Sequence, residues 1–94
     1  MKNILGSIFV YILECNDNSL YTGWTTNLER RLASHNAGTG SRYTRMRKPV
    51  KLVFVESHTT KSSAMKREAA IKSYTKSAKL KLISSHQNIF IDNY

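Results

Sequence analysis

The sequence predicts one small α+β domain, in which a three-stranded antiparallel sheet is flanked by about three helices. The chain has 94 residues, which is enough for one modest hydrophobic core but not for two. Stretches that alternate apolar and polar residues, as strands do, are followed by stretches with apolar residues at helical spacing. Since neither a repeat nor a linker interrupts this order, residues 1–94 are expected to form a single domain that ends in a tail at 84–94.

Charge and cysteine content narrow the range of partners. Lys and Arg outnumber Asp and Glu by 15 to 6, giving a net charge of +9 that attracts polyanions, nucleic acid before an anionic membrane surface. A basic surface that only keeps the protein soluble is the plainer explanation. The single cysteine, Cys15, excludes an internal disulfide and a thiolate zinc site, and we expect it in the core. Without a membrane-length apolar run or a cleavable leader, the protein is expected to be cytoplasmic.

The first predicted element is a hairpin. Its strands are the β-branched and aromatic stretch 8–15 and the shorter stretch 20–23, separated by the turn-forming sequence NDN. If the turn has three residues, Tyr11 faces Gly23, and Tyr11 and Tyr21 project from the same face. A turn of two or four residues separates them. Two aromatic residues that merely pack a small sheet are the alternative.

A helix is expected next, over 27–36. Thr26 followed by Glu29 three residues later fits a capping box, and Gly38 ends the helix.

The phase of this helix separates its polar residues. At about 100° per residue, Leu28 and Leu32 form the buried stripe. Arg31 and His35 then lie side by side at the edge of that stripe, and Arg30 points away. Arg31 is a candidate for the site, although its stem could also simply cover apolar surface.

The segment 39–48 is predicted to be a polar, basic loop closed by Pro49. Its residues suited to gripping phosphate are Arg42, Tyr43, Arg45 and Arg47. Tyr43 can also stack on an exposed base. The alternative to a phosphate-binding loop is an ordinary solvated basic loop.

A third strand is predicted at 50–56, because apolar and polar residues alternate there. The residues expected on one face are Val50, Leu52, Phe54 and Glu56.

Two further helices are predicted, at about 61–74 with Thr60 as cap and at 76–85 with Thr75 as cap. The apolar stripe of the first is expected to comprise Ala64, Met65, Ala69 and Ile71. Glu68 falls in the middle of that stripe, and a buried carboxylate is costly unless its charge is compensated. Lys72 one turn later is one compensation. A metal ion, or a site open to water, is the other.

The ordered set of polar residues resembles the GIY-YIG endonuclease superfamily, and most closely its small stand-alone bacterial branch. The two halves of the family motif correspond to Val10-Tyr11-Ile12 and Tyr21-Thr22-Gly23. The family arginine, ten residues after the second tyrosine, corresponds to Arg31, and the histidine four residues further to His35. The family glutamate corresponds to Glu68 in the stretch SAMKREAAIK.

The resemblance covers about 8–83, nearly the whole chain. Trp24 stands where many members have a lysine, three residues after the second tyrosine. Several members carry a C-terminal asparagine in the site, for which this chain offers Asn88 and Asn93.

The resemblance implies phosphodiester hydrolysis with one divalent metal ion. Glu68 is expected to hold a single Mg²⁺ or Mn²⁺ and Arg31 to brace the phosphate. Tyr11 and Tyr21 are expected to orient or deprotonate the attacking water, with His35 as the alternative proton acceptor. The residues expected to bind nucleic acid are Arg42, Tyr43, Arg45, Arg47 and Lys72.

The sequence therefore predicts a metal-dependent endonuclease that acts on DNA. Because no module for reading sequence is attached, we expect it to recognise branched, nicked or single-stranded sites of the kind that DNA repair or recombination produces. One alternative is a non-catalytic nucleic-acid-binding module of the same fold, and another, based on charge alone, is an RNA- or ribosome-associated protein. The oligomeric state is left open.

Overall fold

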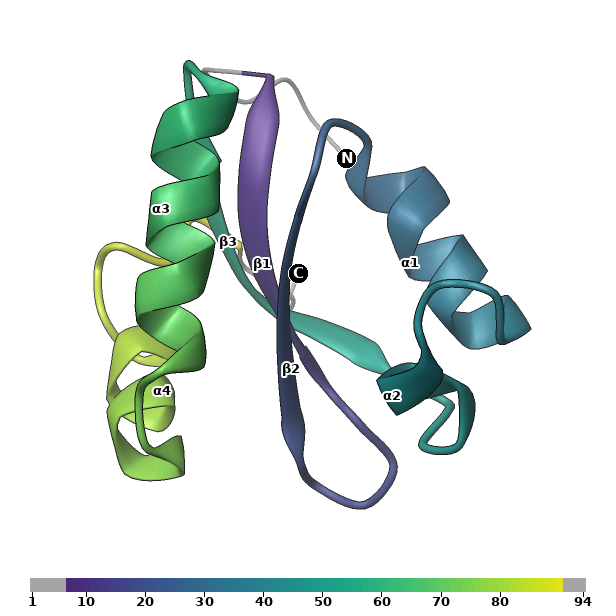
Figure 1. Ribbon diagram of the computed structural model, residues 1–94. Coiled ribbons are helices and arrows are strands. Elements are labelled where there is room, and N and C mark those ends of the chain that lie inside the picture. The colour runs from purple at the N-terminus through teal and green to yellow at the C-terminus, as the bar shows by residue number, and fades with distance from the viewer. Residues whose placement is uncertain (1–6, 91–94) are drawn as a thin grey trace.

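A three-stranded antiparallel sheet forms the middle of the molecule, in the strand order β2-β1-β3 (Figure 1). The computed structural model describes residues 7–90. The strands are β1 (Ile8–Glu14), β2 (Leu20–Thr25) and β3 (Lys51–His58). With the long hydrophobic strand β1 at its centre, the sheet leaves β2 at one edge and β3 at the other.

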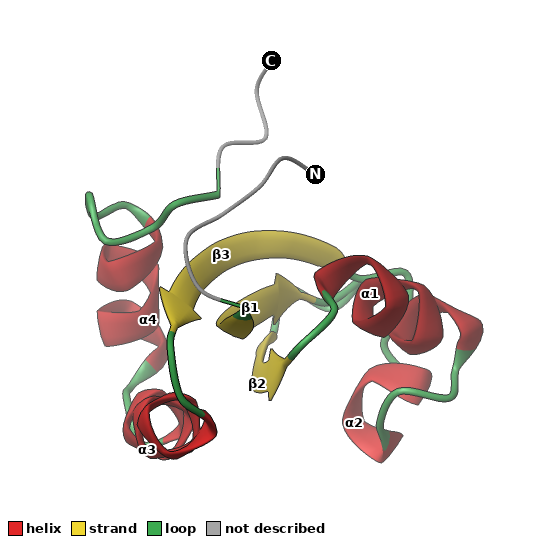
Figure 2. Ribbon diagram, turned by 90° about the horizontal axis from the view of Figure 1, so that it is seen from above, coloured by secondary structure: helices red, strands yellow, loops and turns green. Residues whose placement is uncertain are grey.

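Helices cover both faces of the sheet (Figure 2). They are α1 (Leu28–Ala37), α2 (Arg42–Arg45), α3 (Lys61–Lys72) and α4 (Lys76–Ile83). Figure 2 shows α1 and α2 on one side of the sheet and α3 and α4 on the other. The predicted α+β class is confirmed, with a fourth helix where the sequence predicted only a loop. This short helix α2 begins at Ser41, whose hydroxyl accepts a hydrogen bond from the Thr44 amide.

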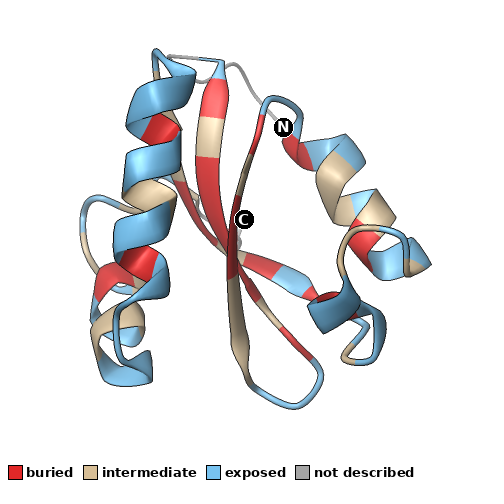
Figure 3. Cartoon of the chain, viewed as in Figure 1, coloured by how far each residue is buried: buried red, intermediate tan, exposed pale blue. Residues whose placement is uncertain are grey.

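Each face of the sheet has its own hydrophobic core. Under α3 and α4 the buried residues are Ile8, Val10, Ile12, Phe54, Ala64, Ile71 and Leu82. Under α1 they are Tyr11, Leu13, Cys15, Leu28, Val50, Leu52 and Val55. β1 contributes alternate residues to both cores, so it is buried along most of its length (Figure 3). Cys15 is buried, as predicted.

The hairpin has the register that places both tyrosines on one face. The Cys15 amide donates to the Ser19 carbonyl and the Asn18 amide to the Cys15 carbonyl, which leaves a three-residue turn. Asn18 has φ 67°, the left-handed conformation that such a turn requires. Tyr11 therefore pairs with Gly23, and both tyrosines face α1.

The predicted face of the third strand is wrong because β3 contains a bulge. Ile12 pairs with Phe54 and Leu13 with Leu52, so Val53 is an extra residue in β3. Beyond it the alternation changes phase. Val50 and Leu52 consequently lie in the core under α1, whereas Phe54 and Glu56 lie on the α3 side.

The capping residues of the helices are those that the sequence predicts, with one exception. Asn27 caps α1, and not Thr26, because the Asn27 side chain accepts from the Arg30 amide. Gly38 ends α1 with φ 86°, and Thr60 and Thr75 cap α3 and α4, all as predicted.

The tail runs along the outer edge of β3. The Ile89 amide donates to the Val55 carbonyl, and the Asn88 side chain bonds to backbone groups of Val53 and Val55. Among the helices formed within residues 7–90, none has the length and hydropathy needed to cross a membrane.

Candidate active site

A pocket of about 400 Å³ lies along the edge strand β2, between α1 and α3. Its lining residues come from four elements and one loop: Tyr11, Tyr21, Gly23, Trp24, Thr25, Thr26, Arg31, Lys61 and Glu68. Four of the five residues that the sequence placed in the catalytic site are among them. The fifth, His35, lies directly behind the two tyrosines.

Gly23 lets the Tyr11 hydroxyl reach the pocket. Tyr11 sits on the central strand, one strand away from the edge, and its ring passes under the backbone of Gly23. A Cβ atom at Gly23 would lie 2.5 Å from the Tyr11 hydroxyl oxygen, which is too close for any side chain. The glycine of the second half-motif is thus required by the tyrosine of the first.

His35 holds the Tyr11 hydroxyl from behind. The Tyr11 oxygen lies 2.9 Å from His35 Nε2, and His35 Nδ1 lies 2.7 Å from Thr44 Oγ1. The histidine is 1% exposed, and the Tyr21 ring packs edge-on against it at 5.2 Å. A Cβ atom at Gly40 would come within 2.5 Å of His35, so a second glycine makes room for this residue.

The electrostatic environment keeps both groups neutral at pH 7. Burial, reinforced by Tyr21, raises the pKa of the Tyr11 hydroxyl above its ordinary value of 10.0. Burial and then the charge of Arg31 lower the pKa of His35 below its ordinary value of 6.5. Tyr11 therefore keeps its proton, and His35 offers a free lone pair on one ring nitrogen. When that lone pair is on Nε2, Tyr11 donates to it and Nδ1–H donates to Thr44.

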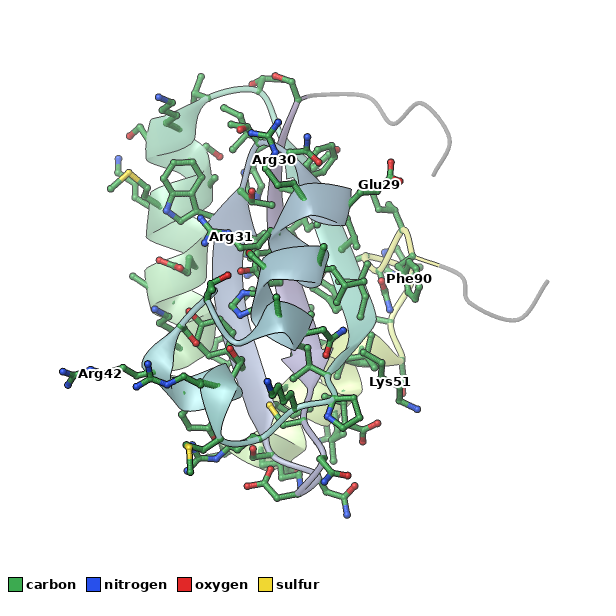
Figure 4. The ribbon with its side chains drawn as sticks, turned by 90° about the vertical axis from the view of Figure 1, so that its right-hand side faces the viewer. Glu29, Arg30, Arg31, Arg42, Lys51 and Phe90 are labelled. Carbon is green, nitrogen blue, oxygen red and sulfur yellow. The ribbon has the colours of Figure 1, made fainter. Side chains whose placement is uncertain are left out.

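Helical phase correctly separated the two arginines of α1. Arg31 is half-buried and lines the pocket, whereas Arg30 is exposed. In Figure 4, Arg31 leaves α1 on the side of α3, and Glu29 projects from the opposite side of the helix.

Glu68 reaches the pocket from α3. Its side chain is 20% exposed, and the nearest basic partner, Lys72, has its Nζ 3.6 Å from Glu68 Oε2. The predicted stripe is partly wrong, since Met65 is 51% exposed and Ala69 is also exposed. The helix contacts the sheet along a narrower line, through Ala64 and Ile71, and Glu68 lies between these two at the margin that opens to the pocket.

The donor set of the pocket suits one hydrated divalent cation. Glu68 is the only carboxylate in the pocket lining, and within residues 7–90 no three His, Cys, Asp or Glu side chains cluster as metal ligands. Mg²⁺ commonly takes one carboxylate and keeps several waters, whereas a two-metal centre needs shared carboxylates.

The residues predicted to bind nucleic acid lie outside the pocket lining. Arg42 and Arg45 are exposed on α2, and Arg42 extends away from the body of the protein (Figure 4). Tyr43 stacks on Tyr21 with ring centres 5.8 Å apart, and the Arg47 guanidinium lies 3.9 Å from the Tyr43 ring centre.

Two of these basic residues lie next to acidic groups. Arg47 pairs with Asp17 at 3.1 Å, and Lys72 pairs with Glu68. The Asn88 side chain makes backbone hydrogen bonds at β3 and is not part of the pocket lining, whereas Asn93 lies outside the described residues.

Sequence reasoning missed Lys61 and Trp24 as pocket residues. Lys61 is seven residues before Glu68, and two helical turns place both on the same side of α3. That spacing was a usable signal. Trp24 belongs to the α3 side of β2, and only the three-dimensional path of the edge strand shows that it also borders a pocket shared with Tyr21.

Comparison with known proteins identifies the family of the chain. The family model described as the GIY-YIG catalytic domain matches residues 7–81. A UPF0213 protein of Staphylococcus haemolyticus is 56% identical over 75 residues, covering 80% of this chain and 92% of the relative. A UPF0213 protein of Clostridium perfringens is 55% identical over 86 residues, covering 92% and 91%.

Two solved structures are also similar. The solution NMR structure of a UPF0213 protein from Bacillus halodurans is 41% identical, with a TM-score of 0.56 over 85% of each chain. The solution NMR structure of a protein from E. faecalis is 41% identical, with a TM-score of 0.60 over 100% of each chain. Since the matching model spans all three strands and every residue that lines the pocket, the chain belongs to the GIY-YIG catalytic domain family, a family of nucleases.

Proposed function

We propose that the protein is a metal-dependent endonuclease that hydrolyses phosphodiester bonds in DNA and selects its sites by structure rather than sequence. The observation that carries this proposal is the convergence of one acid, one guanidinium and two phenols on a single pocket in a chain of a nuclease family. The net charge of +9 supports a polyanionic substrate. We place the activity in the cytoplasm.

Glu68 is proposed to hold one Mg²⁺ or Mn²⁺ ion, with water and substrate oxygens as the other ligands. Bound there, such an ion would stabilise negative charge on the leaving oxygen. The Lys72–Glu68 distance of 3.6 Å is long for a tight ion pair, so the carboxylate remains available.

Arg31 is proposed to bind the phosphate. Its planar group of positively charged donors matches two phosphate oxygens at once. Lys61, across the pocket on α3, adds a second positive charge. In the transition state, negative charge spreads over the equatorial oxygens, and fixed cations that meet it lower the barrier.

Tyr11 and His35 are proposed to move the proton of the attacking water. The raised pKa of Tyr11 prevents it from acting as a preformed phenolate. It can accept a proton from water only while it passes its own proton to His35 Nε2, 2.9 Å away. Tyr21, whose ring packs on His35, orients the water on the pocket side.

The outer basic residues are proposed to hold the flanking nucleic acid. Arg42 and Arg45 on α2 are exposed, and Lys72 lies at the end of α3. Tyr43 and Arg47 form a stacked pair beside Tyr21, which extends the basic surface beyond the pocket. Contacts of this kind fix the position of the strand without reading bases.

Replacing Glu68 by Gln tests the proposal. We expect Mg²⁺-dependent cleavage of branched, flapped or single-stranded DNA to fall by a factor on the order of 100 or more, with DNA binding retained. Glu29→Gln is the matched control, because Glu29 projects away from the pocket (Figure 4).

A non-catalytic nucleic-acid-binding module of the same fold is the second candidate, favoured by the pairing of Glu68 with Lys72. Wild-type protein that cuts none of these substrates with Mg²⁺ or Mn²⁺, yet binds them, establishes the module in place of the nuclease.

A further inference from the structure

Trp24 is the only tryptophan in the chain, and it lies at the border between core and pocket. From β2 it packs against the hydrophobic core under α3 and is only partly buried. The same side chain lines the pocket together with Arg31, Lys61 and Glu68. One part of the indole is therefore fixed by the core while another part is presented to whatever enters the pocket.

The Trp24 indole is partly buried and lines the pocket, whereas the other candidate for stacking is occupied. Tyr43 already stacks on Tyr21, and the Arg47 guanidinium lies over its ring. Among the ring–ring and cation–ring contacts within residues 7–90, none involves Trp24. A flat aromatic group entering the pocket therefore meets an indole that no other ring or guanidinium among the described residues covers.

The charges beside Trp24 fit a phosphate. Arg31 and Lys61 both line the pocket, which holds one carboxylate, Glu68. A volume of about 400 Å³ is in the range of sites that hold small molecules, about 300–1,000 Å³. An aromatic platform next to cationic groups is the combination that binds single-stranded nucleic acid, because every base has a face that can stack.

We propose that the pocket binds one unpaired nucleotide of a DNA strand, with its phosphate beside Arg31 and Lys61 and its base stacked on Trp24. The inference rests on the proposed function in that both place a DNA phosphate next to Arg31. It goes further because, among branched, flapped and single-stranded DNA, it selects the substrates that offer an unpaired nucleotide. A base inside a duplex is stacked on its neighbours and cannot lie on the indole unless it is extruded. The preferred substrates are therefore single strands and flaps rather than intact duplex.

Binding without cleavage tests the inference. In metal-free buffer, wild-type protein is titrated with a ten-nucleotide oligothymidylate and with a ten-unit abasic strand of the same charge. Because Trp24 is the sole tryptophan, its intrinsic fluorescence reports directly on stacking. We expect quenching by the oligothymidylate only. Its affinity should exceed that of the abasic strand by between about fivefold and one hundredfold, the usual effect of one stacked base.

A variant series separates stacking from charge. Trp24→Leu, followed by anisotropy of a labelled oligothymidylate, should lose affinity by the same factor and should no longer distinguish the abasic strand. Trp24→Phe, which keeps a ring, should lose less. Circular dichroism checks that each variant is folded, and the two-ligand comparison on wild-type protein stands even if a variant is not. Equal affinities for both strands with unchanged fluorescence overturn the inference.

The outcome is independent of catalysis. Base-dependent binding in a protein that never cuts DNA supports the inference and removes the nuclease proposal. Cleavage that is unaffected by Trp24→Leu, together with equal binding of the abasic strand, supports the nuclease proposal and overturns the inference about Trp24.

Discussion

At the scale of single residues, the site depends on the space that glycines leave as much as on its polar side chains. Gly23 leaves the space through which the Tyr11 hydroxyl reaches the pocket. Gly23→Ala should destabilise the protein by about 1–3 kcal/mol, because the new methyl group overlaps the phenol ring. It should also break the bond between Tyr11 and His35. Urea unfolding measures the loss of stability.

The control is a double-mutant cycle with Tyr11→Leu, which removes the ring that the methyl group meets. Gly23→Ala should cost much less in that background. An equal cost in both backgrounds shows that the glycine is needed for some other reason.

His35 should make stability depend on pH. In the unfolded chain it titrates near 6.5, and in the folded protein its pKa is lower. Between these two pH values the unfolded state binds more protons, so the free energy of unfolding decreases as pH falls below about 6.5. Above that pH the stabilisation that comes from the neutral histidine is fully present. At one pH unit below 6.5, the loss is at most about 1.4 kcal/mol.

Urea unfolding at several pH values should show a smaller loss for His35→Gln than for wild-type protein. His58→Gln, at a histidine that pairs with Glu56 and Ser63 away from the pocket, is the control and should keep the loss caused by His35. If His35→Gln has the same pH dependence as wild-type protein, the histidine is not held neutral by the fold.

At the scale of elements, the tail is attached to the sheet mainly through Asn88. Its Oδ1 accepts from the amides of Val55 and Phe90, and its Nδ2 donates to the carbonyls of Val53 and Ile83. Asn88→Ala leaves these backbone groups without that partner and should reduce the free energy of unfolding by about 1–3 kcal/mol.

Thermal or urea unfolding tests this, with the exposed neighbour Gln87→Ala as control. An equal, small effect of both substitutions means that the tail adds little stability.

The elements show how much the sequence could predict. The hairpin and the helices carry local signals, so spacing alone gave the phase of Arg31. It gave the register of Tyr11 only on condition that the turn has three residues, which the structure then shows. The bulge at Val53 has no local signal, since the alternation of β3 reads as regular. Trp24 was missed for a related reason, since its place in the pocket depends on how two elements meet. Lys61 is different, because its spacing of seven residues from Glu68 already placed both on one side of the same helix.

At the scale of the whole molecule, net charge should dominate the salt dependence of binding. If about five cations contact phosphates, the slope of log K against log salt for a single strand is roughly −3.5. Affinity should then fall about a hundredfold between about 50 and about 200 mM salt. Anisotropy of a labelled single strand over a salt series measures the slope.

Arg31→Gln should make that slope shallower by about 0.7, because one phosphate contact is lost. Lys51→Gln is the control, since Lys51 pairs with Glu14 at 3.3 Å and does not line the pocket. A slope that Arg31→Gln leaves unchanged places the phosphate contacts elsewhere.

The two borders of the sheet have different neighbours. The tail of the chain forms hydrogen bonds with the outer side of β3, whereas within residues 7–90 no strand pairs with the outer side of β2. Open strand borders generally invite another copy of the same protein. Here the flanking guanidinium and ammonium groups repel a second molecule of equal positive charge, while they draw in a chain of phosphates. The molecule can therefore leave the outer side of β2 without a partner strand and still not promote its own aggregation.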